Sequence, residues 1–576
     1  MRTTGNRIYS MQRFVKNRDR RIQIRRRHIS LLVTLGLPVA FLCLLIARST
    51  TLVYADTYTV TSTDASGSGS LQQAIIHANN SAGHDTITFD ASVTGTIVLT
   101  AALPAINGDL TISGPGADQL AISGGNTYRV FSIAPGAAMT VSGVTVQDGY
   151  ADAGGGIWSA GNLHLDAVHL LSNLAASHGG GLYVFQGSAT LLGTHVVSNS
   201  AIYGGGVYVS SGSATLIGTQ VLSNSASSRG GGVYVEQDSA MLSVNEGGIG
   251  SNSAGYGGGG LCVQRGTATL TRTRVFSNSA HSPGGGVFVS SGSATLIGTQ
   301  VLSNSAQAGG GMFIEFGSAR LTGTQVVGNW ASARLWGGGG MFVERGSATL
   351  NGTQVLSNSA QAGGGGVRVS HGSVKLSGAQ VIGNSALDGG GVFLGGPSLP
   401  AGNVDAALDN AVIADNQVAG EGSGLYVENN STARLRHNTI ARNTGGSGIH
   451  IALNSTVALT NTIVVSHTVG ILATAGNTAT LESTLWGIGA WANMIDTLGL
   501  VISNTNITGN PAFIDPDAGN YHIGSTSTAI NAAVNAGITT DIDGQSRPAG
   551  SGYDIGADEF WRQIYLPVVS DLHQWP

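Results

Sequence analysis

The chain is poor in cysteine, in charge and in aromatic residues. Its 576 residues include only 2 cysteines, Cys43 and Cys262, while charged residues make up 10% of the chain and aromatic residues 6%. This scarcity of cysteine excludes the disulfide scaffold of small secreted domains. Stability therefore has to come from packing and hydrogen bonding. Glycine is the opposite case, with 89 residues.

Basic residues are missing from most of the chain. Residues 1–55 hold 11 of the 26 basic residues and one of the 31 acidic residues, so the remainder carries 15 basic and 30 acidic residues, a net charge near −15. That remainder has a single lysine, Lys375. Nucleic-acid binding needs a basic footprint, so we expect no nucleic-acid partner.

The first 55 residues have the organisation of an export signal. A basic stretch precedes the 19-residue apolar run Ile29–Ala47, and Val53-Tyr54-Ala55 ends in a small residue. This pattern predicts a signal peptide cleaved before Asp56. An uncleaved signal anchor is the alternative, because about 20 apolar residues span a bilayer. In both cases we expect residues 56–576 to be extracellular or on the cell surface, touching a membrane only through an uncleaved N-terminus.

A short phrase recurs about once every 25 residues along the rest of the chain. It consists of a Gly run, an aliphatic–aromatic–aliphatic triplet, Ala-Thr-Leu, and Val-x-Ser-Asn. Val207–Ala226 and Val287–Ala306 differ only at Tyr208 versus Phe288. The last Gly of each run stands at positions 156, 181, 206, 232, 260, 286, 311, 340, 366 and 391. A fixed period of this size predicts a solenoid of stacked coils.

Within each coil, aliphatic residues recur at every second position, as expected for the buried face of a β-strand. The aliphatic residues of the triplet, such as Val207 and Val209, are two apart and therefore share one face of a strand, which we expect to point inward. A Leu column, including Leu216, adds a second inward strand. The third run ends in Asn, as at Asn224 and Asn252, and stacked Asn amides at a bend satisfy each other and the backbone.

Three parallel strands per coil with a buried Asn at one bend resemble the right-handed parallel β-helix of pectate lyases. The Gly-Gly-Gly-Val-Tyr and Ser-Asn-Ser-Ala phrases also resemble the passenger repeats of polymorphic outer-membrane proteins over residues 140–480. These resemblances imply an all-β protein with one solenoid of about sixteen coils. We expect an N-terminal cap and first coils over residues 56–125, the β-helix repeats over 126–490, and the last coils, a cap and a tail over 491–576.

Both ends carry segments that differ from the repeats. Residues 67–79 predict a short amphipathic capping helix with Ser70 as its N-cap. The C-terminal Asp-Ile-Asp-Gly-Gln-Ser-Arg-Pro and Asp-Ile-Gly-Ala-Asp-Glu phrases resemble the closing segment of the "choice-of-anchor" β-helix proteins. We expect a structural cap with an Asp–Arg547 pair. A calcium site at Asp541 and Asp543 is the weaker alternative, because the other ligands of a calcium loop are missing. No other cofactor is expected.

The residue between the two inward aliphatic columns points outward and is mostly aromatic. We expect an exposed stripe that binds sugar rings, or, as the alternative, a self-stacking ladder that only stabilises the sheet. Arg368 and His450 stand in the same column and favour exposure. The candidate ligand-binding residues are Tyr183, Tyr208, Tyr234, Phe288, Phe313 and Phe342 in the column, with Trp330 and Trp336 in a long loop beside it.

Two glutamates occupy one register position in consecutive coils. Glu315 and Glu344 each follow the aromatic by two residues, so their backbones are expected about 4.8 Å apart. That spacing is comparable to the carboxyl separation of about 5–5.5 Å in retaining glycosidases. They are weak catalytic candidates, because glutamates at strand ends on an acidic surface need no function.

The sequence therefore predicts a monomeric exported β-helix protein with a structural or adhesive role and a polysaccharide or cell-surface partner. A polysaccharide lyase or hydrolase using the same face is the first alternative. A passive spacer without a ligand is the second.

Overall fold

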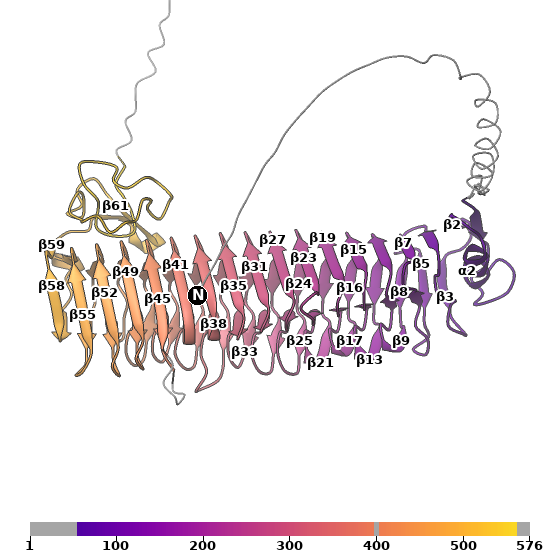
Figure 1. Cartoon of the computed structure of the whole chain (residues 1–576), viewed down its shortest axis with the longest axis horizontal. Coiled ribbons are helices and arrows are strands. Elements are labelled where there is room, and N and C mark those ends of the chain that lie inside the picture. Colours follow the sequence, from indigo (N-terminus) through magenta and orange to yellow (C-terminus); the bar gives the residue numbers. More distant parts are fainter. Residues whose placement is uncertain (1–54, 397–402, 562–576) are drawn as a thin grey trace, which may run out of the picture. The chain divides into compact units, whose positions relative to one another are not determined.

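The computed structural model describes residues 55–396 and 403–561, which form a right-handed parallel β-helix (Figure 1). The predicted signal segment, residues 1–55, lies outside the described residues except for Ala55. Three parallel sheets run along the solenoid: sheet A with 31 strands, sheet B with 17 and sheet C with 11. Sheet B has one strand in each coil, so the described part of the chain has about seventeen coils where the sequence predicted about sixteen. No helix among these residues has the length and apolar character that a membrane crossing requires.

One coil shows the path of the chain. In sheet A, β14 (Leu182–Val184) is followed by β15 (Ser188–Leu192). The chain then passes into sheet B as β16 (His195–Val197) and into sheet C as β17 (Ser200–Tyr203). Sheet C adds a fourth strand to the three that the sequence predicted for each coil.

Successive coils stack in strict register. Strand β18 (Val207–Val209) pairs with β14 and with β22 (Val233–Val235), so that Val207 lies between Leu182 and Val233. The inward columns are confirmed: Val207, Val209 and Leu216 are all 0% exposed. Because every coil contributes the same apolar positions, the core continues from coil to coil.

The predicted asparagine ladder holds the bend between sheet B and sheet C in each coil. Asn199 Oδ1 accepts hydrogen bonds from Asn173 N at 2.9 Å and from Asn173 Nδ2 at 3.0 Å. Asn199 Nδ2 in turn donates to Leu170 O and to Asn224 Oδ1. This pattern repeats from Asn173 to Asn443, so that each buried amide is paired with its neighbour and with the backbone.

The Gly runs are needed where adjacent coils approach most closely. Gly204 has φ +62°, a conformation that disfavours a side chain, and a Cβ on Gly205 would lie 2.2 Å from Ser225 O. The runs therefore let the chain turn from sheet C back into sheet A.

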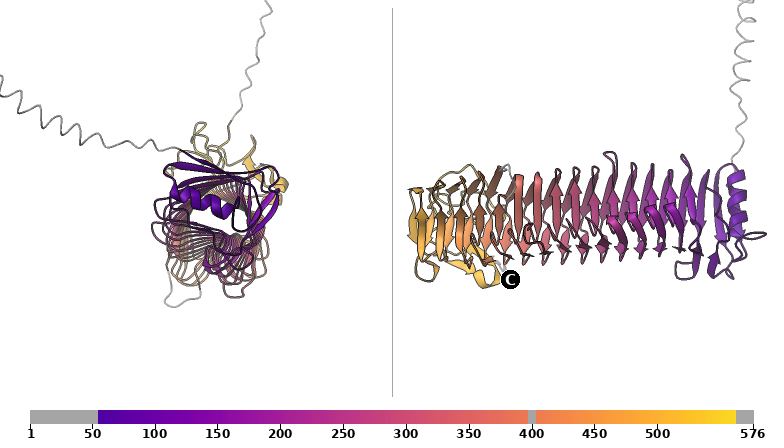
Figure 2. Two further views of the ribbon diagram at one scale, coloured as in Figure 1. Left: turned by 90° about the vertical axis from the view of Figure 1, so that its right-hand side faces the viewer. Right: turned by 90° about the horizontal axis from the view of Figure 1, so that it is seen from below.

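The N-terminal cap agrees with the prediction. Helix α2 (Leu71–Asn80) begins after Ser70, whose Oγ accepts from Gln73 N at 3.2 Å. Leu71 and Ile75 pack into the solenoid core, and the helix lies across the end of the coils (Figure 2). The first coils are built from β1 (Thr57–Val60), β2 (His84–Phe89) and β3 (Gly95–Val98).

The C-terminal segment packs along the side of the solenoid. After the last coil, β57 (Ile495–Gly499), β58 (Val501–Asn504) and β59 (Ile507–Gly509), the chain turns back and forms the antiparallel pair β60 (Phe513–Asp515) and β61 (Asn520–Ile523), beside the outer face of sheet B (Figure 1). We call residues 513–560 the fold-back segment. It leaves apolar residues of the last coil exposed, including Met494, Leu498 and Ile502.

Apolar packing holds the fold-back segment against the coils, together with the ion pair between Arg442 Nη1 and Asp517 Oδ1 at 2.6 Å. Its residues Tyr521 and Ile555 join a cluster with Ile463 and Leu485 from the coils. The expected Asp–Arg547 pair is wrong in its partner, because Arg547 Nη1 pairs with Glu559 Oε2 at 2.7 Å, both side chains being buried.

Candidate functional site

The outward aromatic column is buried, so the prediction of an exposed stripe is wrong. Tyr183 is half-buried, and the other five residues of the predicted set are at most 5% exposed: Tyr208, Tyr234, Phe288, Phe313 and Phe342. Their rings pack against one another outside the main core, with centroids 5.0 Å apart both for the stacked pair Tyr208–Tyr234 and for the edge-on pair Phe313–Phe342. We call this column the aromatic ladder. Of the two readings of the sequence, the self-stacking ladder describes its packing.

Side chains at the ends of sheet C strands, just before the Gly runs, cover the aromatic ladder. His178 packs edge-on against Tyr208, with centroids 4.7 Å apart, and Tyr203 lies 5.6 Å from Tyr234. The Arg229 guanidinium lies over the Phe288 ring at 5.8 Å. The repeat period predicted the aromatic column correctly, but it did not indicate that side chains of sheet C lie over the rings.

Arg368 and His450 were taken as signs of exposure, and both are buried, at 3% and 7% exposed. The Arg368 guanidinium lies between two ladder rings, 5.3 Å from Phe342 and 4.9 Å from Phe393. Burial lowers the pKa of Arg368 to about 10, opposed by the nearby Glu428 carboxylate. A cation is stable here because aromatic faces attract it.

A groove remains open beside the covered ladder. Two cavities, of ≈ 450 Å³ and ≈ 230 Å³, are both lined by Tyr256 and are therefore adjacent along the coils. We call them together the corner groove, because they lie where sheet C turns into sheet A. The first is lined by His178, Tyr203, Tyr208, Ser228, Arg229, Tyr234, Glu236, Tyr256 and Gln264, and the second by Tyr256, Ser282, Pro283, Gln307, Ala308, Phe313, Glu315, Trp336 and Glu344.

Polar side chains in the first cavity are held by one another. Arg229 lies over the Tyr256 ring at 4.8 Å, and its Nη1 is 3.4 Å from Gln264 Oε1. The Tyr234 hydroxyl donates to the same Gln264 oxygen. Glu236 Oε2 accepts from Ser210 Oγ at 3.2 Å. These contacts place a guanidinium, a carboxylate and an exposed aromatic ring in one wall.

The two predicted glutamates meet in the second cavity. Strand β34 (Met312–Glu315) pairs with β38 (Met341–Asn351), which puts Glu315 in register with Glu344. Burial raises the pKa of Glu344, and the Glu315 carboxylate adds to this rise, while Arg345, 3.8 Å away, opposes it. Glu344 therefore favours the protonated form more than an exposed glutamate does.

Of the two loop tryptophans, the structure places one in the groove. Trp336 lines the second cavity, is 43% exposed, and lies 6.0 Å from the Phe342 ring. Trp330 is 39% exposed on the sheet C strand β37 (Trp330–Ala331) and is not among the residues that line the cavity. The sequence analysis missed Tyr256 and Arg229 as groove residues. Both stand just before a Gly run, where the otherwise similar coils differ in sequence, and this difference was the available signal.

The candidate calcium ligands have separate environments. Asp541 Oδ1 accepts from the backbone N–H of Asp543 and of Gln545, and its Oδ2 accepts from Glu559 N. Asp541 therefore holds a turn together. The Asp543 side chain instead faces His522, 2.8 Å from its Nε2.

Comparison with known proteins supports the fold. Residues 336–485 match a family model described as the right handed beta helix region. No curated protein matches the chain. A solved chain from Geobacillus virus E2, ORF18, shares 13% identity over 65% of this chain and 62% of its own, with a TM-score of 0.27. The match thus spans less than two thirds of the viral chain.

Proposed function

We propose that this protein is an exported surface β-helix that binds a polysaccharide in the corner groove. The observation that carries the proposal is the shared Tyr256, because it joins the two cavities into one elongated site along the coils. Polysaccharides are extended, and successive sugar rings of one chain suit an elongated groove. The basic N-terminal stretch and the apolar run after it support export.

The chemistry of the walls suits a neutral glycan. Tyr256 and Trp336 offer partly exposed aromatic faces, 42% and 43% exposed, on which sugar rings stack. Arg229, Gln264 and Glu236 supply hydrogen-bond donors and acceptors for hydroxyl groups. Because the groove holds three carboxylates and one guanidinium, a polyanionic chain would be repelled.

The test measures retention of the full-length protein in gels containing neutral or acidic polysaccharides. We expect retention by a neutral polysaccharide, and we expect Tyr256→Ala and Trp336→Ala each to weaken it about tenfold or more, as loss of one stacking face does. Leu335→Ala is the matched control, because Leu335 is 70% exposed beside Trp336 and does not line the groove. Equal retention of all three variants and the wild type would contradict the proposal.

A second candidate function is cleavage of the bound glycan by Glu315 and Glu344. The observation that favours it is their register pairing in one cavity together with the raised pKa of Glu344. Protonated Glu344 would give its proton to the glycosidic oxygen while the Glu315 carboxylate attacks the anomeric carbon. Water would then release the sugar from Glu315, with Glu344 taking the proton of that water.

A reducing-end assay distinguishes cleavage from binding alone. If the glutamates cleave, wild-type protein releases reducing ends, and Glu315→Gln and Glu344→Gln abolish release but keep retention in the gel. Glu246→Gln is the matched control, because Glu246 is exposed and lines neither cavity. Retention without release by the wild type leaves binding as the function and rules out cleavage of the polysaccharides tried.

A further inference from the structure

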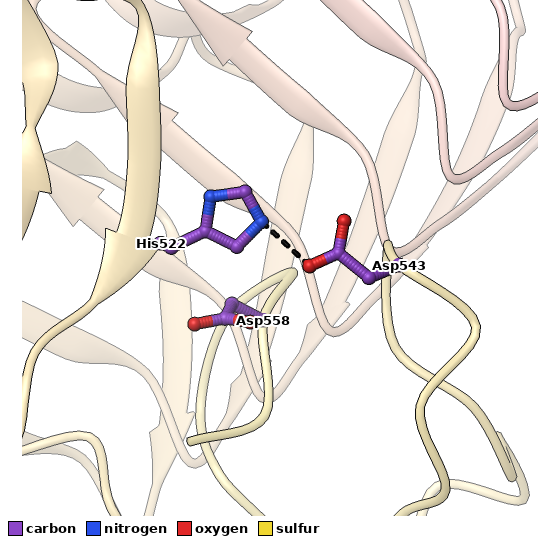
Figure 3. A group of neighbouring side chains, drawn as sticks. All are labelled: His522, Asp543 and Asp558. Carbon is purple, nitrogen blue, oxygen red and sulfur yellow. Dashed lines mark hydrogen bonds and ion pairs between the residues drawn. The ribbon is translucent and has the colours of Figure 1, made fainter. Parts of the chain in front are cut away.

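Three potential metal ligands from separate parts of the fold-back segment converge on one point. His522 belongs to β61, Asp543 to the turn after it, and Asp558 to the end of the segment (Figure 3). One ligand atom from each lies within 4.8 Å of the others. In the described part of the chain, no other group of three such residues is this close.

The histidine is oriented as in metal sites. Asn520 Oδ1 accepts from His522 N at 3.1 Å, and it lies 2.5 Å from His522 Nδ1. Since a carbonyl oxygen only accepts, Nδ1 carries a proton and Nε2 is the atom directed at the carboxylates. Metal-binding histidines commonly donate their other ring N–H to an oxygen in this way, which fixes the tautomer and the ring plane.

The carboxylates are also held by neighbouring groups. Asp558 Oδ2 accepts from Ile523 N at 2.8 Å, and Asp558 is 6% exposed. Asp543 is more open, with its side chain 44% exposed, and its turn is held by Asp541. All three ligands line one cavity of ≈ 640 Å³, which has room for water or a further ligand at the open coordination positions.

We propose that His522, Asp543 and Asp558 bind a divalent transition-metal ion such as Zn²⁺ or Mn²⁺. One imidazole and two carboxylates suit these ions, whereas Ca²⁺ prefers oxygen ligands alone. Two carboxylates also balance the charge of one divalent ion. The ion joins β61, the Asp543 turn and the end of the fold-back segment, and it thereby stabilises their folded arrangement. This site is independent of the corner groove.

The test titrates chelator-treated full-length protein with ZnCl₂, MnCl₂ or CaCl₂ in a calorimeter. We expect one high-affinity Zn²⁺ per chain, a higher thermal midpoint with Zn²⁺, and no competition from an equal concentration of Ca²⁺. Asp543→Asn and His522→Gln are each expected to weaken Zn²⁺ binding at least tenfold, as the loss of one ligand does.

Two control variants account for other histidines and carboxylates. His169 and His195 stack with ring centroids 4.8 Å apart on sheet B and form another place where imidazoles are close together. His195→Gln removes one of these two histidines. His450 and Glu421 form a pair at 3.3 Å, so Glu421→Gln removes a histidine-bound carboxylate elsewhere. Both variants are expected to keep the wild-type Zn²⁺ affinity.

Two results would overturn the proposal. Zn²⁺ binding that is absent, or unchanged in Asp543→Asn and His522→Gln, would make His522 and Asp543 an ion pair only. Tighter binding of Ca²⁺ than of Zn²⁺ would exclude the transition-metal class. If the variants fail to fold, Co²⁺ added to wild-type protein keeps the test open: visible absorption bands that one equivalent of Zn²⁺ removes support the site, and their absence contradicts it.

Discussion

His467 occupies the position after Asn443 in the asparagine ladder, and its Nε2 lies 3.1 Å from Asn443 Nδ2. The amide donates this hydrogen bond, so Nε2 is unprotonated and Nδ1 carries the proton that it shares with Asn493 Oδ1 at 3.1 Å. The ring is 4% exposed and has amides as both partners. The ladder thus continues through a neutral imidazole.

The first prediction is that His467 makes stability pH-dependent. Burial lowers the pKa of His467 to about 4 from the ordinary 6.5. The unfolded chain therefore binds more protons than the folded one between these values, and the free energy of unfolding falls as pH drops through this window. The full loss is about 3 kcal/mol, from about 1.36 kcal/mol per unit. His467→Asn restores the ladder residue and should remove this loss, as measured by urea unfolding at pH 7 and pH 4.

The comparison with His467→Asn cancels the other titrating groups, including His437. His281→Asn is the control, because His281 is exposed. A wild type and a His467→Asn variant that lose equal stability between pH 7 and pH 4 would contradict this account.

The second prediction concerns the asparagine ladder. Asn304 Oδ1 accepts from Asn278 N and Asn278 Nδ2, both at 3.0 Å. In Asn304→Ala these two buried donors lose their acceptor, which should cost about 2–4 kcal/mol. Urea unfolding and amide exchange of the neighbouring coils measure the loss. Asn162→Ala removes an exposed amide that accepts from Ser188 Oγ, and it should cost less than about 0.5 kcal/mol. Equal costs at the two positions would be evidence against the ladder.

The third prediction separates the aromatic ladder from the corner groove. Phe342 is 0% exposed and packs edge-on against Phe313, so Phe342→Ala should cost about 3–5 kcal/mol of stability. Tyr256 is 42% exposed, so Tyr256→Ala should leave the thermal midpoint within about 2 °C of the wild type. Calorimetric melting of both variants checks this. A Phe342→Ala variant as stable as the wild type would mean that the ladder is open to solvent.

The fourth prediction tests the fold-back segment. Glu559→Gln leaves the buried Arg547 without its charge partner, and removal of one member of a buried pair costs about 3–5 kcal/mol. We expect protease cleavage within residues 513–560 while the repeats stay protected, measured by limited proteolysis with mass mapping. Glu246→Gln breaks the exposed pair with Arg272 and should change stability by less than about 1 kcal/mol. Protection of the fold-back segment in Glu559→Gln would show that its internal ion pair is not needed to keep it folded.

The repeat made several features predictable, because each was repeated in every coil. The inward Val and Leu columns, the asparagine ladder and the register of Glu315 with Glu344 follow from this spacing. Helix α2 and its Ser70 cap occur once and follow from a local capping signal instead. The short strands of sheet C were missed, because a strand of two residues, such as Ser253–Ala254, is too short to show the alternation of inward and outward side chains.

The sequence by itself determined the fold, the direction of each side chain relative to the coil, and the register of equivalent residues, since stacking repeats every position at the strand spacing. Whether an outward-facing side chain is exposed or buried by side chains of other strands depends on the tertiary structure. Tyr208 leaves the core and is still buried, because His178 of the preceding turn lies across it. His522, Asp543 and Asp558 likewise meet only because the fold-back segment folds on itself, and contacts between separate stretches of sequence leave no trace in a local pattern.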